Sequence, residues 1–166
     1  VGIVCQGGTR FVNADLTDAD FTQATLKNVN FRNAILTRTC WFSVRRLDSA
    51  SIEGTYLKSS KIRQLVTTKN SREQEFNYLN LRGLNLKNAD LQNASFVGAD
   101  LSLANLENTN LRSAKLAQSQ LYQTNLNHAD LTGAYIQNWG ISTDTQLDGI
   151  KCEYIYMRLP TKDDPD

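Results

Sequence analysis

The sequence predicts an all-β solenoid, a chain that winds around one axis in short segments separated by turns. A large apolar residue recurs every five positions through most of the chain, as at Leu91, Phe96 and Leu101. A small residue stands two positions before each of them, such as Ala89 and Ala94, and the remaining positions are mostly polar. A period of five keeps one face on neither an α-helix nor a straight strand, so the chain must turn once per repeat.

Two arrays follow this rule. The first has apolar positions at Phe11, Leu16, Phe21, Leu26, Phe31, Leu36 and Trp41, and the second runs in strict register from Phe76 to Ile141. In a narrow coil the large side chains fill the axis, and the small ones let neighbouring walls approach. We expect the core to contain Leu16, Phe21, Leu26, Phe31, Leu36, Leu86, Leu91, Phe96, Leu101, Leu106, Leu111, Leu116, Leu121, Leu126, Leu131 and Ile136.

The pattern breaks between residues 42 and 75. The step from Trp41 to Leu47 is six, which predicts a one-residue bulge near residues 42–47 that places Arg45 in an inward slot. From Ile62 the next position of the repeat pattern is Phe76, fourteen residues later, and the wholly polar stretch of residues 67–74 between them predicts a projecting loop near residues 65–75. Loops on rigid scaffolds often carry function.

The two ends of the array need caps because an open coil exposes strand edges. Residues 1–10, which are apolar and then Gly-rich, are expected to form the N-terminal cap, followed by a β-helix over residues 11–141. Residues 142–158 are expected to leave the register, and residues 142–166 to form a C-terminal cap with a loose acidic tail. Tyr154, Tyr156 and Met157 would let this coil cover the array or form an end-to-end dimer.

The motif A-[DN]-L-x-x, as at 89–91, 99–101, 104–106 and 129–131, resembles the pentapeptide-repeat proteins over roughly residues 11–141. The segment after the repeats also resembles cyanobacterial members of that family. The resemblance implies a right-handed quadrilateral β-helix with four pentapeptides, or twenty residues, in each of about six coils. Residues twenty apart would then stack, which would put Asn85, Asn105 and Asn125 in one column.

Composition adds a few limits. The 166 residues suit one domain, and 18 Lys and Arg oppose 17 Asp and Glu, a net charge of +1. No apolar run is long enough for a transmembrane helix, and no signal peptide is visible, so we expect no membrane insertion and a cytoplasmic location. The chain begins at Val1, which suggests a trimmed chain or part of a longer protein. The three cysteines are too scattered for a disulfide framework or a zinc site.

Catalytic chemistry finds little support. His128 is the single histidine and falls at an outward turn position, and no metal, nucleotide or nucleophile motif occurs. Asp90 and Asp130 would lie on one wall about 10 Å apart, but a flat wall offers neither concavity nor a raised carboxyl pKa. We expect no catalytic, cofactor-binding or metal-binding residues.

The sequence therefore predicts a non-enzymatic structural or protein-interaction module, a rigid rod that acts as a spacer or presents a binding surface to an unknown protein partner. Such a rod would suit one domain of a larger regulatory protein. The candidate interaction residues surround the interruption and are Arg45, Arg46, Lys61, Arg63, Lys69 and Arg72. Nucleic acid is not expected, because acids dilute these bases and no aromatic platform accompanies them. The alternative is a DNA mimic that binds a topoisomerase such as DNA gyrase; it requires a strongly negative surface, and residues 76–141 carry four acids and four bases.

Overall fold

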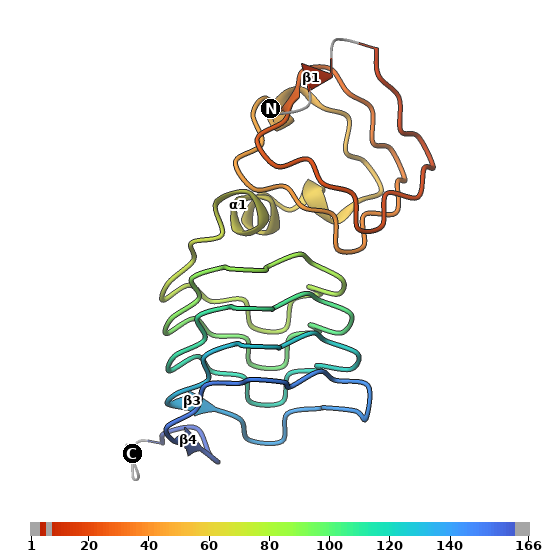
Figure 1. Cartoon of the computed structure of the whole chain (residues 1–166). Helices are drawn as coiled ribbons and strands as arrows, with labels where there is room; N and C mark the ends of the chain where they lie inside the picture. The colour runs from red at the N-terminus through yellow and green to blue at the C-terminus, as the bar shows by residue number, and fades with distance from the viewer. Residues whose placement is uncertain (1–3, 6–7, 162–166) are drawn as a thin grey trace. The chain divides into compact units, whose positions relative to one another are not determined.

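A computed structural model describes residues 4–5 and 8–161, which divide into two compact units. Unit 1 comprises residues 1–69 and 83–85, and unit 2 comprises residues 70–82 and 86–166. In both units the chain winds into stacked coils (Figure 1). The division into a cap, one interrupted β-helix and a second cap stays a prediction.

In unit 1, successive coils pair in parallel, at positions twenty residues apart in most of the walls and twenty-one apart where β1 pairs. Strand β1 (Val4–Cys5) pairs with β2 (Thr25–Leu26), and single-residue bridges join the other walls. Those bridges are Arg10 with Asn30, Asp15 with Ile35, Asp20 with Cys40, and Thr25 with Arg45. Each wall contributes only one or two paired residues before the chain turns. Most of the pairing therefore consists of single-residue bridges, and the strands are only two residues long.

The chain leaves the twenty-residue register after Arg45, because Asn30 pairs with Ser51. Arg46 takes a left-handed conformation at φ 62° and precedes a short 3-10 helix, η1 (Leu47–Ser49). The expectation that Arg45 fills an inward slot is wrong: its backbone pairs with Thr25 and its side chain is exposed. The extra residue, Arg46, lies in the turn, where an outward side chain costs no core volume.

The expected projecting loop near residues 65–75 is also wrong. After a second 3-10 helix, η2 (Tyr56–Lys58), the chain forms α1 (Ser60–Thr68), a helix in an otherwise coiled unit (Figure 1). The α1 residues Ile62, Leu65 and Val66 are buried, so an amphipathic pattern underlies this helix. Its N-cap is Ser59, whose side chain accepts a hydrogen bond from the Ile62 N–H at 3.4 Å.

The coils of unit 2 begin at residue 70, inside the segment expected to be a loop. Asn70 pairs with Asp90 and Glu75 pairs with Ser95. Ser71 is buried, and it occupies the inward position five residues before Phe76. The apolar pattern misses this repeat because a small serine, rather than a large apolar residue, fills its inward slot.

Unit 2 pairs in the same way, with bridges to the following coil at residues such as Asp90, Ser95, Asp100 and Asn105. Near the C-terminal end the spacing becomes 21, and strand β3 (Ala134–Tyr135) pairs in parallel with β4 (Ile155–Tyr156). Residues after 141 therefore leave the five-residue register by one position, yet they still form a coil.

The cores of the two units consist of the inward residues. All of the expected core residues are buried except Leu16, which lies in the first coil and is only partly buried. In unit 1 the inward aromatic rings stack across successive coils: Phe11 on Phe31 at 5.3 Å and Phe21 on Trp41 at 5.0 Å between ring centroids. Burial of such rings contributes strongly to stability.

Most corners are four-residue turns whose third residue has positive φ. The backbone N–H three residues after an inward residue donates to that residue's carbonyl, as from Ala94 to Leu91 at 3.0 Å. The turn residues Asn88, Asn93 and Asn108 have φ between 55° and 61°. This pattern is that of a type II turn, which asparagine and glycine adopt most readily.

Candidate interaction surface

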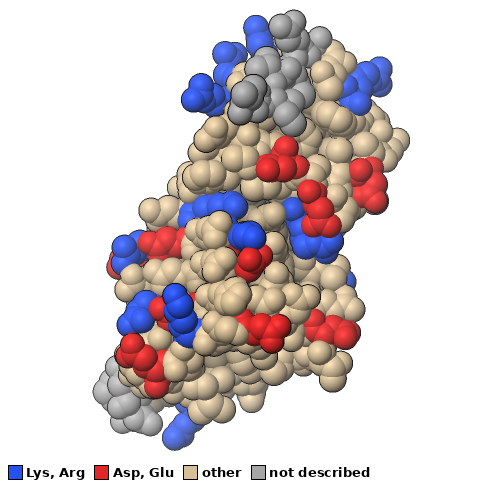
Figure 2. Space-filling model, viewed as in Figure 1, with Lys and Arg blue, Asp and Glu red and all other residues tan. Residues whose placement is uncertain are grey.

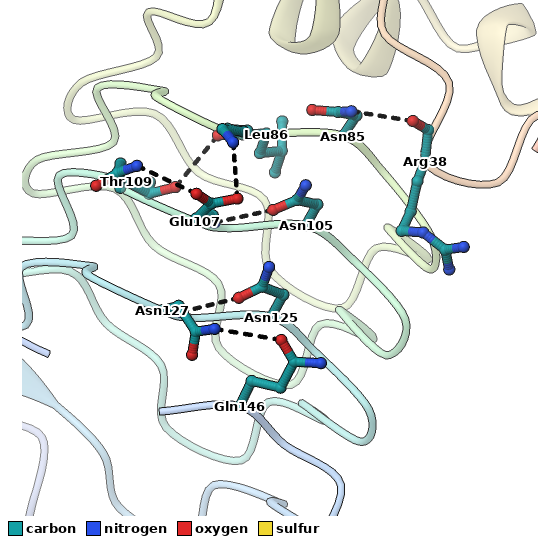
Figure 3. Close-up of polar contacts among 11 residues, drawn as sticks. Arg38, Asn85, Leu86, Asn105, Glu107, Thr109, Asn125, Asn127 and Gln146 are labelled. Atoms are coloured by element: carbon teal, nitrogen blue, oxygen red, sulfur yellow. Dashed lines mark hydrogen bonds and ion pairs between the residues drawn. The ribbon is translucent and has the colours of Figure 1, made fainter. Parts of the chain in front are cut away.

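The polar residues along the walls have a local structural role. The residue before an inward position is often Asn or Asp, and its side-chain oxygen accepts a hydrogen bond from the N–H two residues later. Asn105 accepts from Glu107 and Asn125 accepts from Asn127, both at 3.0 Å (Figure 3). Such Asx turns satisfy a backbone donor at the corner and explain why this position favours Asn and Asp.

Threonine has a similar role in several small inward slots. The Thr109 hydroxyl donates to the Leu86 carbonyl at 3.2 Å (Figure 3), and the Thr124 hydroxyl donates to the Leu101 carbonyl at 2.8 Å. A buried hydroxyl therefore joins neighbouring coils. In unit 1, Asn85 donates from its side chain to the Arg38 carbonyl at 2.9 Å.

Most of the charged side chains of the long array are paired. Lys87 contacts Glu107 at 2.8 Å, Arg112 contacts Asp130 at 3.1 Å, and Arg72 contacts Asp90 at 3.7 Å. Over much of the part of Figure 2 that holds unit 2, basic and acidic side chains lie next to one another. The walls of unit 2 therefore present little uncompensated charge of one sign.

The two carboxylates considered for catalysis are structural. Asp90 accepts hydrogen bonds from the Gln92 N–H and from Asn110, at 3.3 Å and 2.9 Å. Partial burial acts to raise the pKa of Asp130, but hydrogen bonds from Thr132 and Arg112 outweigh it and hold the pKa below its usual value. A carboxyl with a lowered pKa is a poor general acid.

Other reactive groups are scattered over the described residues. His128 is exposed and stands over Gly149, where an added Cβ would collide with the imidazole ring. Cys40 is half-buried, with the Lys69 ammonium 3.8 Å from its sulfur, and Cys152 is exposed. Within residues 4–5 and 8–161, no three His, Cys, Asp or Glu side chains gather as metal ligands.

No helix among the described residues has the length and apolar character needed to cross a membrane.

The candidate interaction residues are not all brought together. Arg45 and Arg46 are both exposed, and the backbone of Arg45 pairs with Thr25. The segment after Arg46 stays close to the coil before it, because the Asn28 N–H donates to the Ser49 hydroxyl at 3.3 Å. Lys61 and Arg63 lie in the first turns of α1, also within unit 1. No ion pair involves Arg45, Arg46 or Arg63 anywhere in the described part of the chain.

The remaining two candidates are engaged elsewhere. Lys69 ends α1 with φ 52°, and its ammonium lies 5.7 Å from the centroid of the Phe42 ring. Arg72 lies in unit 2, where Asp90 neutralises it. The interaction surface considered below is therefore defined as Arg45, Arg46, Lys61 and Arg63, and we call it the basic surface of unit 1.

The charge difference between the units was not visible from whole-chain composition. Unit 1 contains ten Lys and Arg and five Asp and Glu, a net charge of +5. Unit 2 contains eight Lys and Arg and twelve Asp and Glu, a net charge of −4. The whole-chain net charge of +1 conceals this asymmetry because the charges of the two units nearly cancel.

Several solved structures resemble the chain. HetL, a protein involved in heterocyst differentiation regulation from the cyanobacterium Nostoc sp. strain PCC 7120, is 22% identical with a TM-score of 0.38. That match covers 92% of this chain and 60% of HetL, so the chain spans about three fifths of that protein's length. A pentapeptide repeat protein from the cyanobacterium Cyanothece 51142 is 19% identical with a TM-score of 0.39, covering 58% of this chain and 97% of that one.

QnrB1, a plasmid-mediated fluoroquinolone resistance protein, is 16% identical with a TM-score of 0.28, and the match covers 92% of this chain and 90% of that one. At these identities and TM-scores the resemblances carry no argument about function. No curated protein matches the sequence.

The family model for pentapeptide repeats matches residues 7–40, 75–108 and 104–138 in eight copies, which is more than half of the chain. The family implies a right-handed β-helix, and its proteins are generally structural or interaction modules without enzymatic activity. The coil-to-coil pairing, the Asx turns and this match lead to one conclusion: the chain belongs to the pentapeptide repeat family.

Proposed function

We propose that this chain is a non-enzymatic protein-interaction module, and that its partner binds the basic surface of unit 1. The observation that carries the proposal is the contrast between the two units. The long array of unit 2 neutralises most of its charges in ion pairs. Unit 1 carries +5, and its Arg45, Arg46 and Arg63 make no ion pair with any residue that the structure describes. A base without an intramolecular ion pair can bind an acidic partner with no such pair to break first.

A rigid β-helix suits such a role because its coils hold side chains at fixed spacing. The backbone of Arg45 is held by its pairing with Thr25, and α1 is held by three buried apolar residues. Surface side chains on rigid elements lose less conformational freedom on binding than those on loops. The partner would accordingly present carboxylates, and its association would weaken with rising salt.

The DNA-mimic alternative gains no support from this arrangement. Of the four acids in residues 76–141, Asp90, Glu107 and Asp130 are all in ion pairs. Duplex DNA carries one charge about every 1.7 Å along its axis. Unit 2, with a net charge of −4 that includes its acidic tail, falls far short of that density.

The test is affinity capture from a lysate of the source organism with the wild-type chain and two charge-matched variants. The first replaces Arg45, Arg46, Lys61 and Arg63 with Ser. The second replaces four bases of unit 2 that make no ion pair within residues 8–161, which are Arg82, Lys115, Lys151 and Arg158. Both variants lose four positive charges, so they differ only in where those charges lie.

A partner that binds the wild type and the unit 2 variant, but not the unit 1 variant, would support the proposal. Its affinity for the purified chain should then fall with salt in a titration. A partner retained equally by both variants would place binding on another surface and contradict it. Equal loss from both would show that net charge, rather than the basic surface, governs binding, and this also contradicts the proposal.

A further inference from the structure

Cys40 occupies a fixed place on a wall of unit 1. It directly precedes the inward Trp41, and its backbone pairs in parallel with Asp20 of the coil before it. The Cys40 N–H donates to the Ala19 carbonyl at 2.8 Å, and the Cys40 carbonyl accepts from the Phe21 N–H at 2.9 Å. The two coils therefore hold this half-buried thiol in one position on the wall.

The C-terminal end of α1 places an amine against this thiol. The Ser43 N–H donates to the Thr67 carbonyl at 2.9 Å, which ties the last turn of α1 to the same wall. Lys69 follows as the C-cap, with φ 52° and with its N–H donating to the Leu65 carbonyl at 3.0 Å. Its ammonium nitrogen lies 3.8 Å from the Cys40 sulfur, so the fold brings together two reactive groups that are 29 residues apart in sequence.

Neighbouring side chains keep the two groups together. The Thr22 hydroxyl lies 3.2 Å from the Cys40 sulfur. The Thr22 N–H donates to the Asp20 carboxylate at 2.8 Å, and hydrogen bonds from Thr22 outweigh burial and hold the pKa of Asp20 below its usual value. The Cys40 thiol and the Lys69 charge act on that pKa in the same direction, which places the ionised carboxylate near both groups. A carboxylate beside the ammonium favours the position of the Lys69 side chain at the thiol.

A thiol in contact with an amine can become a covalent link when a peroxide is present. Hydrogen peroxide oxidises Cys–SH to the sulfenic acid Cys–SOH and is itself reduced to water. The amine nitrogen then attacks the sulfur, so that an S–N bond forms and the S–O bond breaks. The ammonium loses one proton to solvent before the attack, and a second proton on the nitrogen leaves with the hydroxyl group as water. An amine held in contact reacts ahead of dissolved nucleophiles because its effective concentration is high.

We propose that Cys40 and Lys69 form a peroxide-sensitive pair, in which oxidation joins the Cys40 sulfur to the Lys69 nitrogen as a sulfenamide. The link closes the segment 40–69, which contains η1, η2 and α1, and holds α1 to the wall as unit 1 unfolds. It also removes the positive charge of Lys69. Because Lys69 lies outside the basic surface of unit 1, this proposal does not depend on the partner proposed above.

The test uses the full chain with Cys5→Ser and Cys152→Ser, which leaves Cys40 as the single thiol. Hydrogen peroxide should lower the intact mass by two hydrogen atoms. Trypsin should then release one species in which residues 39–45 are joined to residues 64–72, because it no longer cleaves after the modified Lys69. Dithiothreitol should reverse both changes. The link should also raise the urea midpoint of unfolding until dithiothreitol is added.

Two controls separate the amine from the thiol. Lys69→Arg keeps the positive charge but lacks the primary amine, so oxidation should stop at the sulfenic acid, which dimedone traps. The second control carries Cys5→Ser and Cys40→Ser and keeps Cys152, an exposed thiol that no amine contacts among residues 8–161. It should be oxidised without forming a link.

A reversible link that forms in the Cys40 chain alone supports the proposal. A sulfenic acid at Cys40 that accumulates without a link would overturn it, and so would a Cys40 that stays reduced under conditions that oxidise Cys152. A link of equal yield in the Cys152 chain would overturn it too, and this comparison decides even where Lys69→Arg fails to fold.

Discussion

Asn105 and Asn125 occupy the same position in successive coils, pair with one another in parallel, and each accept a backbone hydrogen bond at 3.0 Å from the residue two positions later. Their side chains therefore stabilise the corner that follows them. The repeated Asn and Asp of this family motif are, in this chain, a device for turning the backbone.

Replacing Asn125 with Ala should lower the free energy of unfolding by about 1 kcal/mol, because the Asn127 N–H loses its acceptor at the corner. Asn125→Asp keeps an acceptor oxygen at the same place and should cost much less. Urea denaturation followed by circular dichroism compares the two. Equal losses for Ala and Asp would show that the side-chain oxygen is not what stabilises the corner.

Gly98 should be intolerant of a side chain because its φ is +65° and the Tyr78 ring covers it, with ring carbons 2.6 Å from where a Cβ would stand. Gly98→Ala is expected to destabilise unit 2 by roughly 1–2 kcal/mol. Adding Tyr78→Ser should recover the stability lost to the clash with the Tyr78 ring. The loss caused by the positive φ of residue 98 should remain. Thermal melts of both single variants and the double variant measure the coupling, and strict additivity would contradict the contact.

Tyr56 and Trp41 form a buried hydrogen-bonded chain in unit 1. Trp41 donates to the Tyr56 hydroxyl at 2.8 Å, and that hydroxyl donates to the Leu36 carbonyl at 3.0 Å. Tyr56→Phe should destabilise unit 1 by about 1–3 kcal/mol, because it leaves the Trp41 indole N–H without an acceptor and removes one of the two hydrogen bonds to the Leu36 carbonyl. The exposed Tyr122 gives the control, since Tyr122→Phe should change little.

Burial also raises the pKa of the Tyr56 phenol. In an ultraviolet titration it should therefore stay protonated beyond the ordinary tyrosine range near pH ~10 until the unit unfolds. Tyr56→Phe should remove the one phenol that ionises only at high pH, which would assign that signal to Tyr56. An unchanged titration curve for Tyr56→Phe would contradict the assignment.

The ion pair of Asp18 and Arg38 should make stability depend on pH. Arg38 donates from Nε and Nη2 to the carboxylate at 2.7 Å and 2.6 Å, and these hydrogen bonds lower the pKa of Asp18 in the folded chain. The stabilisation is therefore complete above the unfolded pKa of about 4 and is lost as pH falls through the lower folded pKa.

Asp18→Asn should accordingly cost about 0.5 kcal/mol near neutral pH, a small value because solvent screens this largely exposed pair. The cost should shrink as the pH falls below about 4. Glu53→Gln is the control, since Glu53 approaches Arg32 only to 3.9 Å. Urea midpoints across the acid range measure both variants, and a difference for Asp18→Asn that does not change with pH would contradict the linkage.

Much of the fold could be predicted because its signal is local and repeated. Each inward Leu or Phe sits five residues from the next, so burial and the turn between them are encoded within one repeat. The prediction failed at two kinds of place: where a polar residue takes an inward position, and where apolar residues form a helix. Ser71 is inward although it is polar, and Ile62, Leu65 and Val66 fit a helix better than a coil, which the period of five concealed.

The candidate surface could be predicted less well, because it depends on contacts between residues distant in sequence. Arg72 belongs to the same basic run as Arg63, yet a partner eighteen residues away, Asp90, neutralises it. The sequence predicts an inward position for Arg45, but its side chain is exposed because the extra residue, Arg46, lies in the turn after it. Charge counts indicate a region, while pairing between coils decides which charges stay available.

The stacking of coils in unit 2 has a mechanical consequence. The hydrogen bonds between coils run along the stacking direction, so a pulling force in that direction loads one coil boundary at a time and does not shear all of them together. Under tension the coils should open one after another from the end of the unit, each at a similar low force. Each coil of twenty residues would release about 70 Å of extended chain, giving a sawtooth of equal steps in a single-molecule stretching trace.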